Sequence, residues 1–336
     1  MAEQESTVNL PRRKFLHLAA GAAALPAVSR IARAQTYPSR PITIVVPYAA
    51  GGPTDVIARV LGDRMRQALG QPVLIENVVG AGGSIGLRRV ARASSDGYTV
   101  GIGNWGTHVA LGVTYQLDYD LLKDFEPVAQ IPGNPMLIVT GKAVPANNLK
   151  ELVAWLKTNQ EKVSVGTSGV GGGSHVAGVF FQNAIGARFQ YVPYRGAGPA
   201  TNDLVAGQID LMVGAPADVL PHLRAGTIKA YAVMTRSRLV AAPDIPTVDE
   251  AGLPGLYLTI WYGLWVPKGT PKIVIDRLNG AAVDAMADLA VRARLADLGL
   301  QYLPREEQTP EALGALQGAE IEKWWPIIKA AGISAE

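Results

Sequence analysis

Short apolar runs alternate with longer amphipathic segments along most of this chain. The runs are rich in β-branched residues, and we predict strands at residues 42–46, 73–76, 99–102, 136–140, 163–167, 191–193, 211–213 and 230–234. Between the runs, apolar residues recur at helical spacing, as Ile57, Leu61 and Met65 do. This alternation predicts an α/β fold with parallel sheets and helices on both faces.

Two proline-containing segments, residues 131–135 and 241–246, interrupt the alternation. The length of the chain also suggests two domains rather than one. We therefore expect the chain to leave one domain, build a second and return, so that it crosses between them twice. The predicted domain 1 comprises residues 36–134 and 247–336, and the predicted domain 2 comprises residues 135–246.

The N-terminal segment has the pattern of an export signal. Arg12 and Arg13 precede an alanine-rich apolar stretch at residues 18–28, and Ala32-Arg33-Ala34 matches a small-x-small cleavage site. Paired arginines favour the twin-arginine route, with an ordinary Sec signal as the alternative. We predict that residues 1–34 are a cleavable signal and that the mature protein is periplasmic.

Removing the predicted signal changes the charge of the chain. The full sequence has 31 basic and 28 acidic residues; residues 1–34 contain five of the former and two of the latter, which leaves 26 of each. A net charge of zero removes the main electrostatic argument for nucleic-acid binding. The absence of cysteine excludes disulfides, thiolate catalysis and cysteine-ligated metals.

The segment at residues 47–55, Pro-Tyr-Ala-Ala-Gly-Gly-Pro-Thr-Asp, connects a predicted strand to a predicted helix. The first N–H groups of a helix have no partner within it, and the helix dipole adds partial positive charge there. Such a loop can hold an anion without any catalytic side chain.

Further glycine-rich segments follow predicted strands at residues 77–84, 101–107, 166–175 and 194–199. Any one of them is explained by a tight turn. Ligands of open α/β sheets bind at the carboxyl ends of strands. Glycine loops at equivalent places in two domains therefore predict a shared ligand cleft.

The residues that resemble catalytic or cofactor-binding motifs do not have the spacing that those motifs require. The Gly-x-Gly-x-x-Gly sequence at residues 101–106 begins inside a predicted strand, unlike a dinucleotide fingerprint. No Gly-Lys-Ser/Thr follows a glycine loop, and Ser174 lacks the Gly-x-Ser-x-Gly spacing of a hydrolase nucleophile. His108, His175 and His222 are not spaced as a metal pair on a helix. We predict no catalytic residue, metal or cofactor, with an NAD-dependent or hydrolytic α/β enzyme as the alternative.

A few side chains near the glycine loops are candidates for contacting an organic ligand. Tyr48, Trp105 and the Trp261-Tyr262 pair could line a pocket, although core packing is an equal alternative for Trp105 and is favoured for Trp261. Arg195 could pair with a carboxylate or be a solvated loop residue. His175 is expected to hydrogen-bond backbone at a helix start, or to donate to a ligand carboxylate.

Several motifs taken together are similar to those of one family, the Bug/TctC solute receptors of tripartite tricarboxylate transporters. The resemblance covers essentially the whole mature chain. Its motifs are residues 37–42 (Tyr-Pro-Ser-Arg-Pro-Ile), 47–55, 77–83, 96–99 (Asp-Gly-Tyr-Thr), 123–128 (Lys-Asp-Phe-Glu-Pro-Val), 192–196 (Val-Pro-Tyr-Arg-Gly), 207–210 (Gly-Gln-Ile-Asp) and 243–247 (Pro-Asp-Ile-Pro-Thr).

The resemblance implies a type II-like periplasmic binding protein, in which two α/β domains joined by two crossings close on a ligand like a flytrap. It also implies that a carboxylate is bound by both glycine loops and handed to a membrane permease. Asp55 is expected to orient its loop rather than touch the anion. The candidate ligand-binding residues are Tyr48, Ala50, Gly51, Gly52, Thr54, Asp55, Gly80, Trp105, Thr167, Ser168, Gly169, His175, Arg195 and Asp218.

One departure from the family pattern concerns the ligand. Family members often have an acid after the strand that here ends in Gly214 and Ala215, whereas this chain has Asp218 three residues on. That difference disfavours an amino-acid ligand. We expect a monomeric, non-catalytic receptor for a mono- or dicarboxylate, including one with an aromatic body, that partners with permease subunits. A sensor that presents its ligand to a signalling receptor is the alternative.

Overall fold

The computed structural model describes residues 37–194 and 196–334. The helices and strands described below all belong to one unit that begins at Arg40. The predicted signal, residues 1–34, and the candidate ligand-binding residue Arg195 lie outside the described residues.

Five strands form a first sheet in the order β2-β1-β3-β10-β4. Strand β1 is parallel to β2 and β3, whereas β10 is antiparallel to both β3 and β4. The strands are β1 (Ile42–Val46), β2 (Val73–Asn77), β3 (Thr99–Asn104), β4 (Phe125–Pro135) and β10 (Thr259–Pro267).

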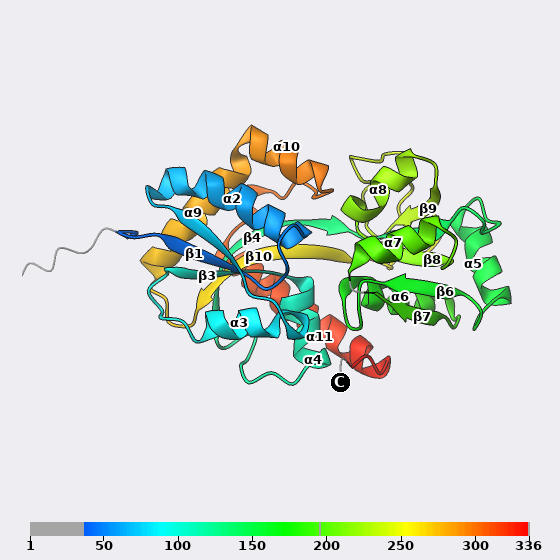
Figure 1. The fold of residues 1–336 in the computed structure, drawn as a ribbon, viewed down its shortest axis with the longest axis horizontal. Coiled ribbons are helices and arrows are strands. Elements are labelled where there is room, and N and C mark those ends of the chain that lie inside the picture. The colour runs from blue at the N-terminus through cyan, green and yellow to red at the C-terminus, as the bar shows by residue number, and fades with distance from the viewer. Residues whose placement is uncertain (1–36, 195, 335–336) are drawn as a thin grey trace, which may run out of the picture. The chain divides into compact units, whose positions relative to one another are not determined.

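Helices cover both faces of this sheet. In Figure 1, α2, α9 and α10 lie on one side of it, and α3, α4 and α11 lie on the other. The helices are α2 (Pro53–Leu69), α3 (Ser84–Ala91), α4 (Leu111–Thr114), α9 (Lys272–Ala287), α10 (Leu289–Asp297) and α11 (Pro310–Ala330). Three short turns accompany them: η1 (Ala81–Gly83), the π-helical η2 (Gly106–Ala110) and η3 (Arg305–Glu307).

A second sheet has the strand order β7-β6-β8-β5-β9. Strand β6 is parallel to β7 and β8, whereas β5 is antiparallel to β8 and β9. Its strands are β5 (Leu137–Gly141), β6 (Ser164–Thr167), β7 (Gln190–Pro193), β8 (Leu211–Gly214) and β9 (Ile228–Val233). Its helices are α5 (Leu149–Thr158), α6 (Gly173–Ile185), α7 (Ala197–Val205) and α8 (Pro216–Arg224).

Both sheets are mixed, whereas the sequence pattern predicted parallel sheets. The antiparallel members are β5, which enters the second sheet directly from the first, and β10, which returns from it. A helical crossover makes successive strands parallel, but a strand that passes straight from one sheet to the next runs against its new neighbours. The predicted strands are all present, and β4 and β10 are additional.

Strand β4 was missed because prolines stand at positions 127, 132 and 135. The segment at residues 131–135, predicted to interrupt the fold, is instead the end of this strand. β4 lies at the edge of the sheet, where one side of each residue needs no ladder partner and proline is therefore tolerated. Its pairing with β10 also contains two irregularities in register.

The two crossings between the sheets are hydrogen-bonded to each other. Met136 N–H donates to Leu258 O at 3.1 Å, Leu258 N–H to Met234 O at 3.0 Å, and Met234 N–H to Met136 O at 2.8 Å. Residues 235–257 remain attached to the second sheet, because Val248 N–H donates to the carbonyl of Val233 in β9. The domain boundary predicted at residue 247 thus falls inside a segment that is bonded to β9.

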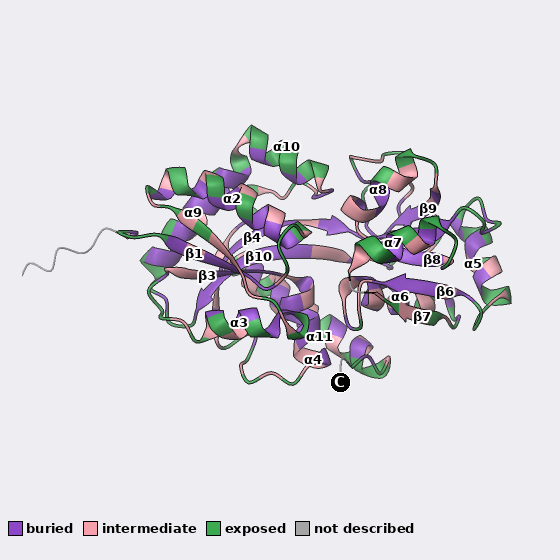
Figure 2. Cartoon of the chain, viewed as in Figure 1, coloured by how far each residue is buried: buried purple, intermediate pink, exposed green. Residues whose placement is uncertain are grey.

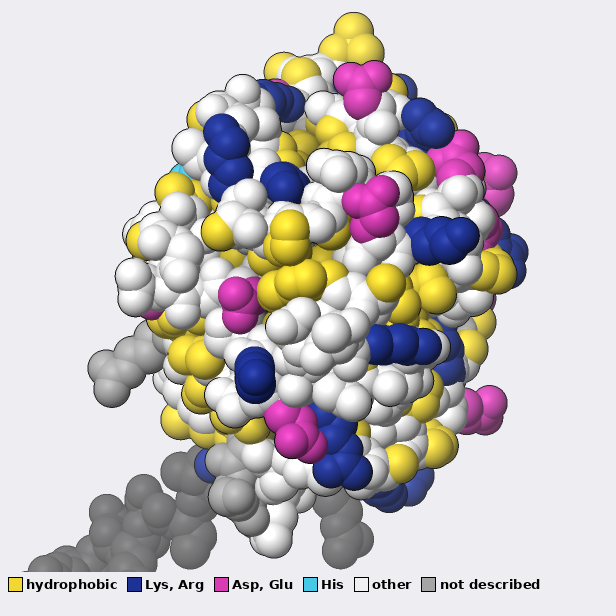
Figure 3. All heavy atoms as spheres, turned by 90° about the vertical axis from the view of Figure 1, so that its right-hand side faces the viewer, with side chains coloured by type: hydrophobic (Ala, Val, Ile, Leu, Met, Phe, Trp, Pro, Cys, Tyr) yellow, Lys and Arg dark blue, Asp and Glu magenta, His cyan; other side chains and the backbone are white. Residues whose placement is uncertain are grey.

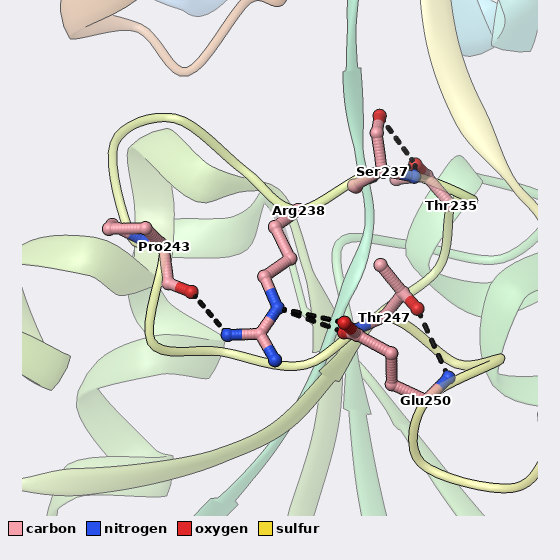
Figure 4. A network of polar contacts seen from close by, with 6 residues as sticks. All are labelled: Thr235, Ser237, Arg238, Pro243, Thr247 and Glu250. Atoms are coloured by element: carbon pink, nitrogen blue, oxygen red, sulfur yellow. Dashed lines mark hydrogen bonds and ion pairs between the residues drawn. The ribbon is translucent and has the colours of Figure 1, made fainter.

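A side-chain network braces this returning segment (Figure 4). Arg238 Nε donates to Glu250 Oε2 at 2.9 Å, and its Nη1 donates to the carbonyl of Pro243 at 2.8 Å. Thr247 N–H donates to Glu250 Oε2, and Glu250 N–H donates back to Thr247 Oγ1. These bonds hold residues 238–250 as a closed loop beside β9.

The core contains large aromatic side chains as well as the central strands, which are largely buried in Figure 2. Trp105, Trp265 and Trp324 are fully buried. Trp105 meets Trp324 edge to face at 5.4 Å, and His108 stacks on Trp265 at 3.5 Å. The indole of Trp105 is therefore a core group.

The surface carries charges of both signs. On the face drawn in Figure 3, basic and acidic side chains are interspersed with apolar ones. Within residues 37–194 and 196–334, no helix combines the length and apolar character that a membrane crossing requires.

Candidate ligand-binding site

The first glycine loop, residues 47–55, connects β1 to α2. Gly52 is the N-cap of α2 and has no side chain to cap it, and Pro53 in the first helical position has no N–H. Gly51 adopts φ 84°, in the region that favours glycine. The backbone N–H groups of Gly52, Thr54 and Asp55 at the start of α2 consequently have no partner within the helix.

Asp55 holds this loop in shape. Its carboxylate accepts hydrogen bonds from Gly51 N–H at 2.9 Å, from Arg59 Nε at 2.8 Å and from Asn77 Nδ2 at 2.9 Å. The hydrogen bond from Arg59 is the largest of the influences that lower the pKa of Asp55 to about 2. Asp55 is therefore ionised and fully engaged, which gives it the loop-orienting role and leaves little capacity for a ligand. The N–H of Gly51 is also engaged, so Gly51 contributes its backbone geometry.

Two partners of this loop were missed by sequence reasoning. Asn77, the last residue of β2, bonds Asp55 and also donates to the carbonyl of Tyr48 at 3.0 Å. Arg59 lies one turn after Asp55 on α2, and the i,i+4 acid–base spacing was the signal available for it. Asn77 gave no comparable signal, because it meets the loop only through the pairing of β1 with β2.

Tyr48 turns towards the end of β3. Its hydroxyl donates to Asn104 Oδ1 at 3.0 Å, and burial raises its pKa to about 12. Asn104 is itself held by Thr107, whose N–H donates to the same Oδ1 at 3.2 Å. The phenol of Tyr48 is thus fixed and neutral beside the carboxyl end of β3.

Gly80 lies in the turn after β2, whereas the side chain of Trp105 points into the core. Gly80 follows β2 at φ 133°, and a Cβ there would lie 2.6 Å from Ile85 Cδ1, so it is needed for the turn. Trp105 follows β3, but its indole Nε1 donates inward to Glu320 Oε2 at 2.9 Å. The structure does not bring the Trp105 ring to the surface near the first glycine loop.

The second glycine loop, residues 166–175, connects β6 to α6. Gly172 is the N-cap of α6, again without a side-chain cap. Thr167 is buried at the end of β6, and Gly169 adopts φ 135°. Ser174 Oγ accepts the N–H of Ser168 at 2.7 Å and lies 2.8 Å from its hydroxyl. Ser174 therefore holds Ser168 in place, a role that sequence reasoning did not assign.

His175 also serves this loop. Its Nδ1 accepts the N–H of Gly171 at 3.0 Å, which assigns the proton of the neutral ring to Nε2. Burial lowers the pKa of His175, so the ring is neutral at pH 7. The imidazole meets Tyr191 at 4.9 Å between ring centres. The arrangement fits the expected backbone hydrogen bond and leaves Nε2–H as a donor.

Asp218 lies in the first turn of α8. Its carboxyl group makes no hydrogen bond or ion pair within residues 37–194 and 196–334, and burial raises its pKa to about 6. The pKa of Tyr262 on β10 is raised first by burial and then by the electrostatic influence of Tyr48 and of Asp218. Tyr262 therefore lies within electrostatic range of one candidate residue from each sheet.

The second glycine loop also contacts elements of the first sheet. A Cβ at Gly171 would lie 3.1 Å from Thr114 of α4, and a Cβ at Gly173 would lie 2.8 Å from Ile260 of β10. Glycines at these two positions therefore permit the close approach. Arg195 cannot be placed, since it lies outside the described residues.

Several helix N-termini at this end of the sheets lack a side-chain cap. The helices that begin just after strands β1, β2, β6, β7 and β8, namely α2, α3, α6, α7 and α8, have no side-chain cap. Helices α4 and α9 are also uncapped, whereas α5, α10 and α11 are capped by Asn148, Asp288 and Thr309. Uncapped N-termini present partial positive charge and free N–H donors, and both suit an anion. In the described part of the chain, no cluster of histidine or acidic side chains could hold a metal ion.

Comparisons with known proteins agree on one kind of receptor. A family model described as tripartite tricarboxylate transporter family receptor matches residues 57–333. MatC from Rhodopseudomonas palustris, solved with bound malate, is 38% identical with a TM-score of 0.78, covering 87% of this chain and 100% of its own. The periplasmic binding protein BugD is 40% identical with a TM-score of 0.78, covering 89% and 99%. A second R. palustris protein, solved with adipate, is 30% identical with a TM-score of 0.79, covering 89% and 99%.

Proposed function

The chain belongs to the family of tripartite tricarboxylate transporter receptors, and on that premise we propose that it captures a small dicarboxylate and delivers it to the permease of such a transporter. The chain is a periplasmic solute-binding receptor of the Bug/TctC type and not an enzyme.

The capping pattern is the observation that carries the proposed binding site. One carboxylate of the ligand would accept hydrogen bonds from the N–H groups at the start of α2. The other end of the ligand would bind the loop before α6. Both helices follow a strand, begin at a glycine N-cap and lack a side-chain cap. An anion at such a terminus gains from the dipole and from direct N–H donors. The bracing of each loop, by Asp55 and by Ser174 with His175, reduces the ordering that binding would require.

The proposed ligand class follows from the backbone N–H groups that would bind the carboxylate charge. Malate and adipate, bound in two of the structural relatives, are both dicarboxylates of different length. Backbone N–H groups recognise charge and shape rather than a particular side group. The burial of Trp105 removes the main argument for an aromatic ligand, so we favour an aliphatic dicarboxylate.

We also propose that the two sheets define two domains that close on the ligand. The hydrogen bonds among Met136, Met234 and Leu258 support boundaries at the crossings themselves. The first domain would then comprise residues 40–135 and 258–334, and the second would comprise residues 137–257. Small-angle scattering with and without ligand tests closure, and an unchanged radius of gyration at saturating ligand would contradict it.

Isothermal titration calorimetry of the mature chain tests the ligand class. The panel contains succinate, malate, adipate and citrate, with succinamide as the uncharged control of matched shape. We expect saturable binding of at least one dicarboxylate and none of the diamide. If no carboxylate gives heat or a thermal shift, the proposed ligand class is wrong.

Uptake measurements test delivery to a permease. Cells that lack the receptor should lose uptake of the labelled ligand identified by calorimetry, and the wild-type chain should restore it. A receptor that only presents ligand to a signalling protein would bind normally in calorimetry but leave uptake unchanged.

A further inference from the structure

A cavity of about 580 Å³ lies away from both glycine loops. One wall is formed by α10 and the segment after it, residues 299–303. The opposite wall is formed by residues 239–241, which belong to the braced loop beside β9. None of the described candidate ligand-binding residues lines it.

The size and lining of this cavity suit a small organic molecule. Ligand pockets in proteins typically enclose roughly 300–1,000 Å³ and are lined mainly by apolar side chains with a few polar groups. Apolar groups here come from Leu239, Ala241, Met286, Leu295 and Leu300. Two further lining residues, Val240 and Tyr302, are 89% and 67% exposed, so apolar surface continues to the outside.

The charged residues at the cavity favour an anion. Arg292 uses Nε to donate to the carbonyl of Met286 at 3.2 Å, and its guanidinium lies 4.9 Å from the ring centre of Tyr302. Within the described residues its two terminal nitrogens make no hydrogen bond or ion pair, so they remain able to bind a carboxylate or sulfonate in a bidentate manner. Arg224, the last residue of α8, is a second cation without an ion pair in this part of the chain. The single lining acid, Asp297, already lies 3.8 Å from Arg294.

The walls are held in place by contacts outside the cavity. The Arg238–Glu250–Thr247 network in Figure 4 closes the loop that carries Leu239 and Ala241. On the other side, Gly299 at φ 77° lies so close to Pro216 that a Cβ would be 2.3 Å from Pro216 Cβ. That contact fixes the start of α8, whose other end supplies Arg224. Each wall is therefore held in shape by neighbouring contacts.

We propose that this cavity is a second ligand site, separate from the dicarboxylate site, that takes an organic anion with an apolar body. Its apolar walls bury the body, and Arg292 with Arg224 binds the charged group. Small dicarboxylates lack the apolar surface to fill this cavity. The two sites therefore differ in ligand chemistry as well as in location.

Fluorescence titration with anilinonaphthalene sulfonate, an apolar anion, tests this site in the mature chain. We expect saturable binding of one probe per protein. Arg224→Gln with Arg292→Gln should weaken binding on the order of tenfold, because a bidentate charged contact is lost. Arg66→Gln on α2 with Lys157→Gln on α5 removes the same two charges away from the cavity and should leave probe affinity unchanged.

A second pair of variants tests the location by volume. Ala296→Trp places a large ring at the cavity wall and should abolish probe binding, whereas Ala290→Trp, at an exposed position in the first turn of the same helix, should not. Circular dichroism and thermal melting establish whether each variant folds. If the Ala296→Trp variant does not fold, the arginine variants still test the proposal. Non-saturating fluorescence, or equal affinity in all variants, would overturn the proposal. So would stoichiometric displacement of the probe by the dicarboxylate found in calorimetry, since the two would then share one site.

Discussion

Replacing Asp55 with asparagine separates loop bracing from simple electrostatics. The carboxylate is 2% exposed and accepts from Gly51, Arg59 and Asn77. An asparagine side chain has the same shape but carries no negative charge. Its NH₂ group would also face one of these donors, so one hydrogen bond would be lost. If Asp55 acted only as a nearby negative charge, removing it would strengthen the binding of an anion. If it braces the loop, removing it should weaken binding.

The size of the effect follows from the pKa. Hydrogen bonds from Arg59 and its neighbours lower the pKa of Asp55 to about 2, against about 3.9 in a free aspartate, which corresponds to about 3 kcal/mol. Because Arg59 is half exposed, screening reduces the expected loss of unfolding free energy to about 1–2 kcal/mol. That loss would lower Tm by roughly 2–6 °C. Dicarboxylate affinity should fall about tenfold as the loop loses its preferred shape.

The assay combines calorimetry with thermal melting as a function of pH. A depressed pKa stabilises the fold above about pH 4, and the benefit disappears as pH falls from about 4 to about 2. The difference in stability between wild type and Asp55→Asn should shrink over that range. Asp63→Asn is the matched control, since Asp63 lies on the same helix, is 75% exposed and pairs with Arg66. Equal or tighter ligand binding by Asp55→Asn would refute the bracing role.

Three further sets of substitutions probe the rest of the candidate site. Thr167→Ala with Ser168→Ala should weaken dicarboxylate binding about tenfold while the fold remains intact by circular dichroism; an unchanged Kd would place the site elsewhere. Gly80→Ala should cost about 1–3 kcal/mol of stability because of its positive φ and close neighbours, whereas Gly198→Ala, with open space around it, should cost less than about 1 kcal/mol; equal Tm changes would contradict this. Asp218→Asn should raise Tm clearly at pH 7.5 but hardly at pH 3.5, because burial raises the carboxyl pKa from 3.8 to about 6 and the wild type loses stability as pH rises through that range; an equal gain at both pH values would point to another cause.

The strands could be predicted from local pattern, and the exceptions have a physical reason. The buried strands that follow helical crossovers are short β-branched runs, and each is found within a residue or two of its predicted bounds. Strand β4 escaped because its prolines are acceptable only at the edge of a sheet, and which strand lies at an edge is a property of the assembled sheet. The antiparallel direction of β5 and β10 likewise depends on the route of the chain between the sheets.

The geometry of the two glycine loops was predictable where it rests on the local backbone and unpredictable where it rests on partners distant in the sequence. Glycine loops that follow predicted strands predict, from sequence alone, helix N-termini without a side-chain cap. The inward turn of Trp105 depends on Glu320, which is 215 residues away on α11. The brace that Asn77 adds to Asp55 depends on the pairing of β1 with β2.

The amino-acid sequence by itself therefore determined the alternation of strands and helices, the glycine loops and the family to which their motifs point, because each is local. The tertiary structure decided the mixed sheets, the place where the chain returns at Leu258, the burial of Trp105 and the cavity beside α10. Each of these requires residues far apart in the chain to meet, and sequence spacing carries no information on such meetings until the sheets have formed.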